Sequence, residues 1–188
     1  VAREKGIPVV ERFFGVELAD DLVRQGQGAD LMAANNVLAH VPDINDFVGG
    51  FARLLRPAGV ATFEFPHLLR MVQQCQFDTA YHEHYSYLSL TAVRRIFAAN
   101  GLHVFDVQEL PTHGGSLRVF AQRGDSGTQP VRASVAQVLA TEQAAGCSTP
   151  AFYETFQRQP ERIACELISF LMAQTNQGRR VVAYGAAA

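Results

Sequence analysis

No other stretch of the 188 residues concentrates as much proton-transfer capacity as residues 81–87. They read Tyr-His-Glu-His-Tyr-Ser-Tyr and combine two imidazoles, one carboxylate and three phenols. A free imidazole titrates at about 6.5 and is a usable general base at neutral pH, while a phenol can donate a hydrogen bond to a developing oxyanion. The alternative is a tyrosine-rich edge strand whose histidines face solvent, and composition alone does not separate the two.

A metal site is a second interpretation of the same segment. On a strand, His82 and His84 would point to one face, as paired metal-binding histidines do, and His113 would complete the set. However, Glu83 would point the other way, and no acidic ligand follows at a recognisable spacing. A metal-dependent hydrolase or oxygenase using His82, His84 and His113 stays open as the alternative function.

The tetrapeptide His113-Gly114-Gly115-Ser116 is similar to the glycine motif that forms the oxyanion hole of esterases. The Gly-x-Ser-x-Gly nucleophile elbow that such enzymes require is absent from the sequence. The esterase interpretation is therefore weaker than the other two. His113 and Ser116 would either contact a substrate or shape a tight turn, and the turn is slightly favoured.

The elements before residues 81–87 predict a parallel sheet covered by helices. Residues 7–14, 30–37 and 60–65 are apolar runs with strand character, and helical periodicity lies between them at 16–24 and 44–55. This β-α-β-α-β order is typical of an α/β fold whose parallel strands are buried.

Polar residues follow these strands. Asn35, Asn36 and His40 come at the end of one strand, and Glu64 ends the next. Ligands of an open α/β sheet bind beyond the carboxyl ends of its strands, so we expect these residues to converge with residues 81–87. An ionised Glu64 in an apolar strand needs a partner, either a ligand, a backbone group or an ion pair.

The second part of the chain predicts an antiparallel edge and then helices. A helix over residues 90–100 precedes two strands, 102–110 and 117–122, which we expect to pair and to close one edge of the sheet. Two further helices are expected at 131–145 and 151–174, the second with a clear apolar stripe.

Composition excludes several classes of partner. Sixteen basic and eighteen acidic residues leave a net charge of −2, which provides no electrostatic case for a nucleic-acid partner. No apolar run reaches the roughly 18 residues that a membrane span needs. Three widely spaced cysteines fit neither a disulfide framework nor a cysteine zinc site and indicate a cytoplasmic protein. A homo-oligomer is compatible with the sequence.

Four motifs follow one another along the chain, namely Asn36-Val37-Leu38-Ala39-His40-Val41, Phe63-Glu64-Phe65-Pro66, Phe77-Asp78-Thr79-Ala80-Tyr81-His82-Glu83-His84 and His113-Gly114-Gly115-Ser116-Leu117-Arg118. Together they resemble the sugar C-methyltransferases, class I enzymes that use S-adenosylmethionine to methylate C3 of nucleotide-linked 4-keto deoxysugars. The resemblance runs essentially end to end, with the motifs in the family's order.

This resemblance implies a three-part protein of which the chain is an excerpt. Residues 1–125 would be the C-terminal part of a Rossmann-like methyltransferase core, with a mostly parallel sheet and an antiparallel edge pair. Residues 126–188 would be a helical segment that leads into a truncated C-terminal α/β domain, whose first strand lies near residues 181–184. Zinc would belong only to an N-terminal domain outside this chain, so no metal site is expected here.

The resemblance also implies roles for the polar residues. His84 matches the position of the base that removes the C3 proton of a nucleotide-sugar substrate. Tyr81, Glu83 and His40 surround it, and Tyr81 or His40 would donate to the sugar's 4-oxygen.

The implied cofactor is S-adenosylmethionine, with its pocket incomplete in this chain. Its surviving contacts would be Asn35, Asn36 and Val37, with Phe13 or Phe14 beside the adenine.

Overall fold

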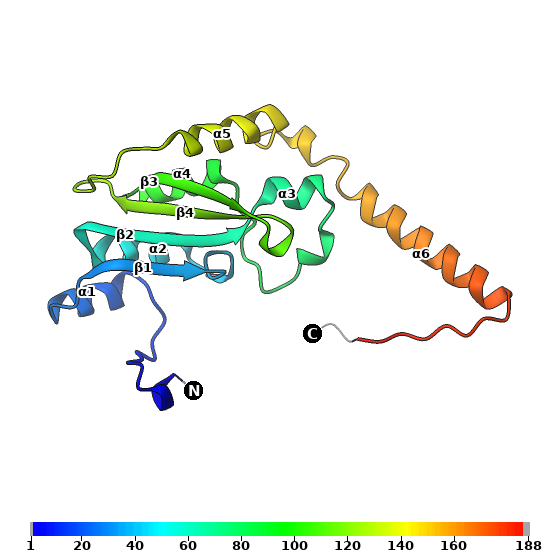
Figure 1. The fold of residues 1–188 in the computed structure, drawn as a ribbon, viewed down its shortest axis with the longest axis horizontal. Helices are drawn as coiled ribbons and strands as arrows, with labels where there is room; N and C mark the ends of the chain where they lie inside the picture. The colour runs from blue at the N-terminus through cyan, green and yellow to red at the C-terminus, as the bar shows by residue number, and fades with distance from the viewer. Residues whose placement is uncertain (1, 186–188) are drawn as a thin grey trace.

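The computed structural model describes residues 2–185, and a four-stranded mixed sheet lies at its centre (Figure 1). The strands are β1 (Ala29–Asn35), β2 (Leu55–Pro66), β3 (Leu102–Leu110) and β4 (Ser116–Arg123), in the order β1-β2-β4-β3. β1 and β2 are parallel, whereas β4 is antiparallel to both of its neighbours, β2 and β3. The predicted α/β class with an antiparallel edge pair is confirmed, although β1–β2 is the only parallel pairing of strands in the described part of the chain.

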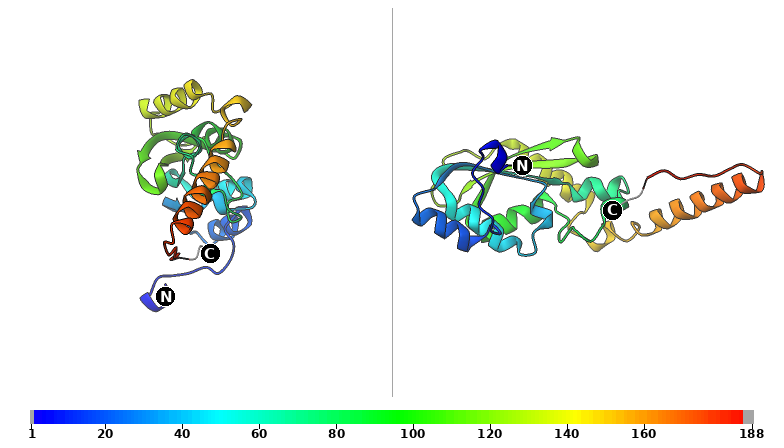
Figure 2. Two further views of the ribbon diagram at one scale, coloured as in Figure 1. Left: turned by 90° about the vertical axis from the view of Figure 1, so that its right-hand side faces the viewer. Right: turned by 90° about the horizontal axis from the view of Figure 1, so that it is seen from below.

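Within residues 2–185, six α-helices accompany the sheet, and α1, α2 and α4 lie against one of its faces (Figure 2). They are α1 (Val16–Arg24), α2 (Ile44–Leu54), α3 (Leu68–Gln73), α4 (Leu90–Ala99), α5 (Ala133–Ala145) and α6 (Arg158–Asn176). Short 3-10 turns are η1 (Arg3–Lys5), η2 (Leu38–His40), η3 (Phe77–Thr79), η4 (Thr112–Gly114) and η5 (Pro150–Phe152).

Two side-chain caps fix where the helices beside the site begin. The Asp43 carboxylate accepts from the backbone N–H groups of Asn45 and Asp46 at the start of α2. The Ser89 hydroxyl accepts from the N–H of Ala92 at the start of α4. Each cap satisfies N–H groups that have no partner within the helix, which explains why the observed starts follow directly after these residues.

The core lies between the sheet and its covering helices. In β2, Ala61, Phe63 and Phe65 are buried, while Thr62 between them is half-buried. The Phe63 ring lies between Phe51 of α2, at a centroid distance of 4.6 Å, and Phe97 of α4, at 4.7 Å. This packing fixes β2 and therefore the residues that follow its carboxyl end.

Two predicted strands are wrong. Residues 7–14 have no regular structure and are mostly exposed, with Phe13 fully exposed. Residues 181–184 are likewise irregular and exposed. β-branched residues favour a strand only where a neighbouring strand takes up their backbone hydrogen bonds, and neither segment has such a neighbour among residues 2–185. The expected burial of β1 is also wrong, because β1 is an edge strand and Leu31 is 70% exposed.

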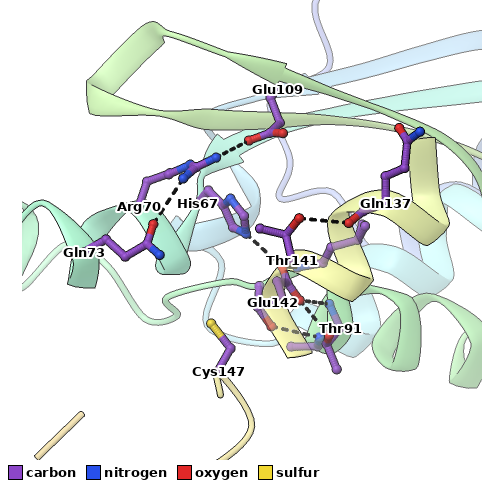
Figure 3. A network of polar contacts seen from close by, with 12 residues as sticks. His67, Arg70, Gln73, Thr91, Glu109, Gln137, Thr141, Glu142 and Cys147 are labelled. Carbon is purple, nitrogen blue, oxygen red and sulfur yellow. Dashed lines mark hydrogen bonds and ion pairs between the residues drawn. The ribbon is translucent and has the colours of Figure 1, made fainter. Parts of the chain in front are cut away.

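A buried carboxylate joins α5 to the rest of the fold (Figure 3). Glu142 is fully buried and accepts four hydrogen bonds: from His67 Nε2 at 2.8 Å, from Leu90 N at 2.6 Å, and from Thr91 N and Oγ1 at 2.9 and 2.6 Å. The two backbone donors belong to the first turn of α4, where a negative charge is favoured. Burial, followed by the charge of Glu142, raises the pKa of the nearby Cys147 thiol to about 11.

The last helix, α6, differs from the others in its exposure to solvent. α6 projects away from the sheet (Figure 1), and none of its residues is buried. The predicted apolar stripe is present but exposed, as Leu167 and Phe170 show. Within residues 2–185, no helix is long and apolar enough to cross a membrane.

Candidate active site

Residues 81–87 form a loop after η3 rather than an edge strand. Hydrogen bonds connect this loop to η2, which follows the carboxyl end of β1. The N–H of Tyr85 donates to the carbonyl of Ala39 at 2.8 Å, and His40 Nδ1 lies 3.1 Å from the carbonyl of Glu83. The predicted convergence of His40 with the 81–87 loop is therefore present in the structure.

Three aromatic side chains surround His84. The ring centroids of Tyr81, His40 and Tyr87 lie 4.4, 4.6 and 5.6 Å from that of His84. His84 is half-buried, whereas Tyr81 and Tyr87 are exposed at 43% and 38%. The arrangement places one imidazole beside a second imidazole and two phenols, at a surface that a small molecule can approach.

Backbone carbonyls determine which nitrogen of each imidazole is free. His84 Nδ1 lies 2.8 Å from the carbonyl of Thr79, and His40 Nδ1 lies 3.1 Å from that of Glu83. A carbonyl oxygen only accepts hydrogen bonds, so each Nδ1 carries the proton and each neutral ring presents a lone pair at Nε2. A neutral His40 then has no proton to donate at Nε2, which leaves the hydroxyls of Tyr81 and Tyr87 as the neutral donors beside His84, with the Tyr81 ring the nearer of the two.

The inner side of His84 is closed. A cavity of about 10 Å³ lies between His84, Phe65, Leu68 and Met71. That volume holds no more than about one water molecule, so a substrate must reach the ring from the outer side.

Glu83 and His82 lie outside this cluster. Glu83 contributes its backbone carbonyl to His40, while its side chain is exposed. The ring of the exposed His82 packs edge-on to Tyr81 at a centroid distance of 6.4 Å. Across residues 2–185, no group of three His, Cys, Asp or Glu residues is arranged to hold a metal ion, so the alternative based on His82, His84 and His113 has no ligand set.

The residues predicted to bind the cofactor fall into two groups. Phe14 and Val37 line one apolar hollow of about 330 Å³ between β1 and α2, together with Met32, Phe47 and Phe51. Asn35 and Asn36 lie at the end of β1, where both are exposed. The N–H of Asn36 donates to the carbonyl of Glu64 at 2.8 Å, and its φ of 54° turns the chain sharply away from the strand.

Glu64 has protein partners for both carboxylate oxygens. Arg118, directly opposite it on β4, donates to Oε2 at 2.8 Å, and the Thr112 hydroxyl donates to Oε1 at 3.3 Å. The ion pair, one of the three predicted kinds of partner, is present.

Sequence reasoning does not single out Gln76 or Thr79 as site residues, although both lie at or beside the motif that leads into His84. The carbonyl of Thr79 accepts from His84 Nδ1 and also from the N–H of Tyr81, at 3.1 Å. Ser116, at the other candidate motif, is buried and donates to the carbonyl of Thr112 at 2.9 Å, in agreement with a turn-shaping role.

Comparisons with known proteins identify related sequences. A model of the C-methyltransferase C-terminal domain matches residues 111–188. The C-methyltransferase NovU of Streptomyces niveus is 33% identical over 186 residues, which are 99% of this chain and 44% of that protein. The chain thus spans less than half the length of this relative.

Solved structures overlap with about half of the chain. A methyltransferase in complex with the Trm112 activator of Haloferax volcanii has 15% identity and a TM-score of 0.45, over 54% of this chain and 56% of that one. The 1,6-didemethyltoxoflavin-N1-methyltransferase of Burkholderia thailandensis has 19% identity and a TM-score of 0.39, over 50% and 43%.

A family model of the methyltransferase domain matches residues 4–107, more than half of the chain and the part that carries His40 and His84. The chain belongs to the methyltransferase family, with a methyltransferase domain followed by a C-methyltransferase C-terminal domain.

Proposed function

We propose that the full-length protein is an S-adenosylmethionine-dependent C-methyltransferase that acts at C3 of a nucleotide-linked 4-keto deoxysugar, with His84 as the general base. The observation that carries this proposal is the environment of His84. Its Nδ1 is bound to a carbonyl, its Nε2 presents a lone pair, and a phenol lies beside it. A C-methyltransferase needs such a base because a neutral C–H carbon is not a nucleophile.

The proposed reaction has two steps. His84 Nε2 takes the C3 proton, and the electrons of the broken C–H bond move toward the 4-carbonyl to give an enolate. The Tyr81 hydroxyl donates a hydrogen bond to the negative 4-oxygen, which stabilises charge where it develops. S-adenosylmethionine, when bound, would supply a methyl group to C3, with its sulfur keeping the electron pair of the broken S–CH₃ bond. The carbonyl re-forms as C3 takes the methyl group, and His84 releases its proton to solvent.

The residues present fit part of an adenosyl group. The hollow between β1 and α2 is apolar, and Phe14 offers it an aromatic ring on which an adenine can pack. Val37 also lines it and is three residues from His40, whose ring lies 4.6 Å from that of His84, so the short η2 turn connects the hollow to the ring cluster of the candidate base. Phe14 and Val37 would hold the adenine, while Asn35 and Asn36 would offer polar contacts at the end of β1.

The proposal is tested by the position of the transferred methyl group. We expect the full-length protein, given a labelled methyl donor and a nucleotide-linked 4-keto deoxysugar, to form a carbon-bound methyl at C3 that is identified by NMR. The matched control is the same nucleotide sugar with a hydroxyl in place of the ketone. It lacks an acidic C3–H and should not react. Label on oxygen or nitrogen, or methylation of the control, would contradict the proposal.

Truncation of Phe14 is expected to weaken cofactor binding. Base–aromatic stacking contributes about 1–3 kcal/mol, so Phe14→Ala should lower the affinity of the full-length protein for S-adenosylmethionine by roughly tenfold, measured by calorimetry. Phe13→Ala is the control, because this neighbouring ring is fully exposed and outside the hollow. Equal affinities for the two variants would remove Phe14 from the adenine site. Thermal unfolding of each variant shows whether the loss of the Phe14 contacts with Phe47 and Phe51 lowers the stability of the fold.

A further inference from the structure

The turn that leads into β4 packs against Arg70 of α3 and against Gln76, which follows α3. His113, Gly114 and Gly115 have successive positive φ angles of 52°, 73° and 122°. A side chain on Gly114 would collide with the Gln76 amide, and a Cβ on Gly115 would stand 2.8 Å from Arg70 Cγ. Glycine is favoured at both positions because their positive φ angles are strained for residues that carry a side chain.

Gln76 connects that turn to the loop of the candidate base. Its side-chain Nε2 donates to the carbonyl of Gly114 at 2.8 Å. Its own backbone carbonyl accepts from the hydroxyl of Thr79 at 2.8 Å and from the Thr79 N–H at 3.2 Å. Two groups of Thr79, its hydroxyl and its N–H, therefore bind the same carbonyl of Gln76.

The carbonyl of Thr79 in turn holds the reactive residues. It accepts from His84 Nδ1 at 2.8 Å and from the N–H of Tyr81 at 3.1 Å. One oxygen thus fixes the tautomer of the candidate base and the start of the loop that carries the phenol. A displacement of this oxygen would move both groups together.

We propose that Gln76 and Thr79 are positioning residues for His84, which hold its Nδ1–H on the Thr79 carbonyl and so make Nε2 the atom that takes the substrate proton. The Gly114 turn acts on the site through Gln76 and touches no reacting atom. This inference rests on the proposed function for its kinetic consequence, whereas the tautomer of His84 is measurable without any substrate.

The kinetic test compares isosteric and conservative variants of the full-length protein. Thr79→Val removes the hydroxyl that binds the Gln76 carbonyl, and a misplacement of about 1 Å can cost about 10²-fold in rate. We expect kcat for methylation to fall by about tenfold to a hundredfold with KM for both substrates unchanged, and Thr79→Ser to restore it. Gln76→Leu should resemble Thr79→Val, while Gln73→Leu on α3 should match the unaltered protein. Full rates in both Thr79→Val and Gln76→Leu would overturn the proposal.

A second measurement reads the His84 ring directly. In histidine-labelled protein at pH about 8.5, where a free imidazole is neutral, long-range ¹H–¹⁵N spectra distinguish the two tautomers. The signals of His84 are assigned by their loss in His84→Gln. We expect a protonated Nδ1 in the unaltered protein and an increased share of protonated Nε2 in Thr79→Val. A protonated Nε2 in the unaltered protein, or identical spectra for the two, would overturn the positioning role.

The two tests separate this inference from the proposed function. If the unaltered protein does not methylate C3, the proposed function fails, and the spectra still decide the role of Thr79. If it methylates C3 and both variants keep the full rate, only the positioning role fails.

Discussion

His84→Ala in the full-length protein is expected to lower kcat for methylation by about 10²–10⁴-fold, the usual contribution of a positioned general base. The variant keeps the hollow that contains Phe14 and Val37, so its affinity for S-adenosylmethionine should be unchanged. Steady-state rates with the 4-keto sugar and calorimetry with the cofactor give the two quantities. A loss of rate without a loss of cofactor binding is the signature of a missing base.

His82→Ala is the matched control for this experiment. It removes the same type of side chain two residues away, from an exposed position outside the ring cluster. We expect a rate close to that of the unaltered protein. A larger rate loss in His82→Ala than in His84→Ala would contradict the assignment of the base.

Glu142→Ala is expected to destabilise the fold by about 3–5 kcal/mol, the range seen when one partner of a buried ion pair or network is removed. The substitution leaves His67 Nε2 without its acceptor, in a ring whose buried Nδ1 already has no hydrogen-bond partner among residues 2–185. It also removes the acceptor for two N–H groups in the first turn of α4. Urea unfolding of the chain measures the change, with exposed Glu161→Ala as the control and an expected effect within about 0.5 kcal/mol.

The same carboxylate predicts a pH dependence. Burial raises the pKa of Glu142, but hydrogen bonds from His67, Thr91 and Leu90 outweigh that effect and place it below the ordinary value. A lowered pKa in the folded state means that the stabilisation is complete above the unfolded-state value of about 4.3 and is lost as pH falls through the folded-state pKa. Glu142→Gln should lack this part of the acid sensitivity. An equal slope of unfolding free energy against pH in both proteins would contradict the role of Glu142.

Much of the fold follows from local signals in the sequence. Asp43 and Ser89 each offer a side-chain oxygen at the start of an apolar periodic stretch, and each caps the helix that follows it. The prediction of a strand at residues 7–14 was wrong. β-branched residues favour a strand, but the sequence does not show whether a neighbouring strand is there to pair with it. The insertion of β4 between β2 and β3 is a long-range pairing that no local pattern encodes.

The candidate site also has features that the sequence predicts and features that it does not. The types and order of the residues predicted that His40, Tyr81 and His84 belong to one site, and in the structure the rings of His40 and Tyr81 lie beside that of His84. The roles of the Thr79 and Glu83 carbonyls depend on loop conformation, and every residue has a carbonyl, so the sequence contains no signal for them. A single acidic residue such as Glu142 within a helix is most often solvated, and only the tertiary structure shows it to be buried.

The central claim is that His84 removes the C3 proton before methyl transfer, and hydrogen exchange tests it most directly. The full-length protein is incubated in D₂O with the nucleotide-linked 4-keto deoxysugar and S-adenosylhomocysteine, so that no methyl group can be transferred, and deuterium at C3 is followed by NMR. We predict enzyme-dependent incorporation at C3 in the unaltered protein and in His82→Ala, and its loss in His84→Ala. Undiminished incorporation in His84→Ala would contradict the account.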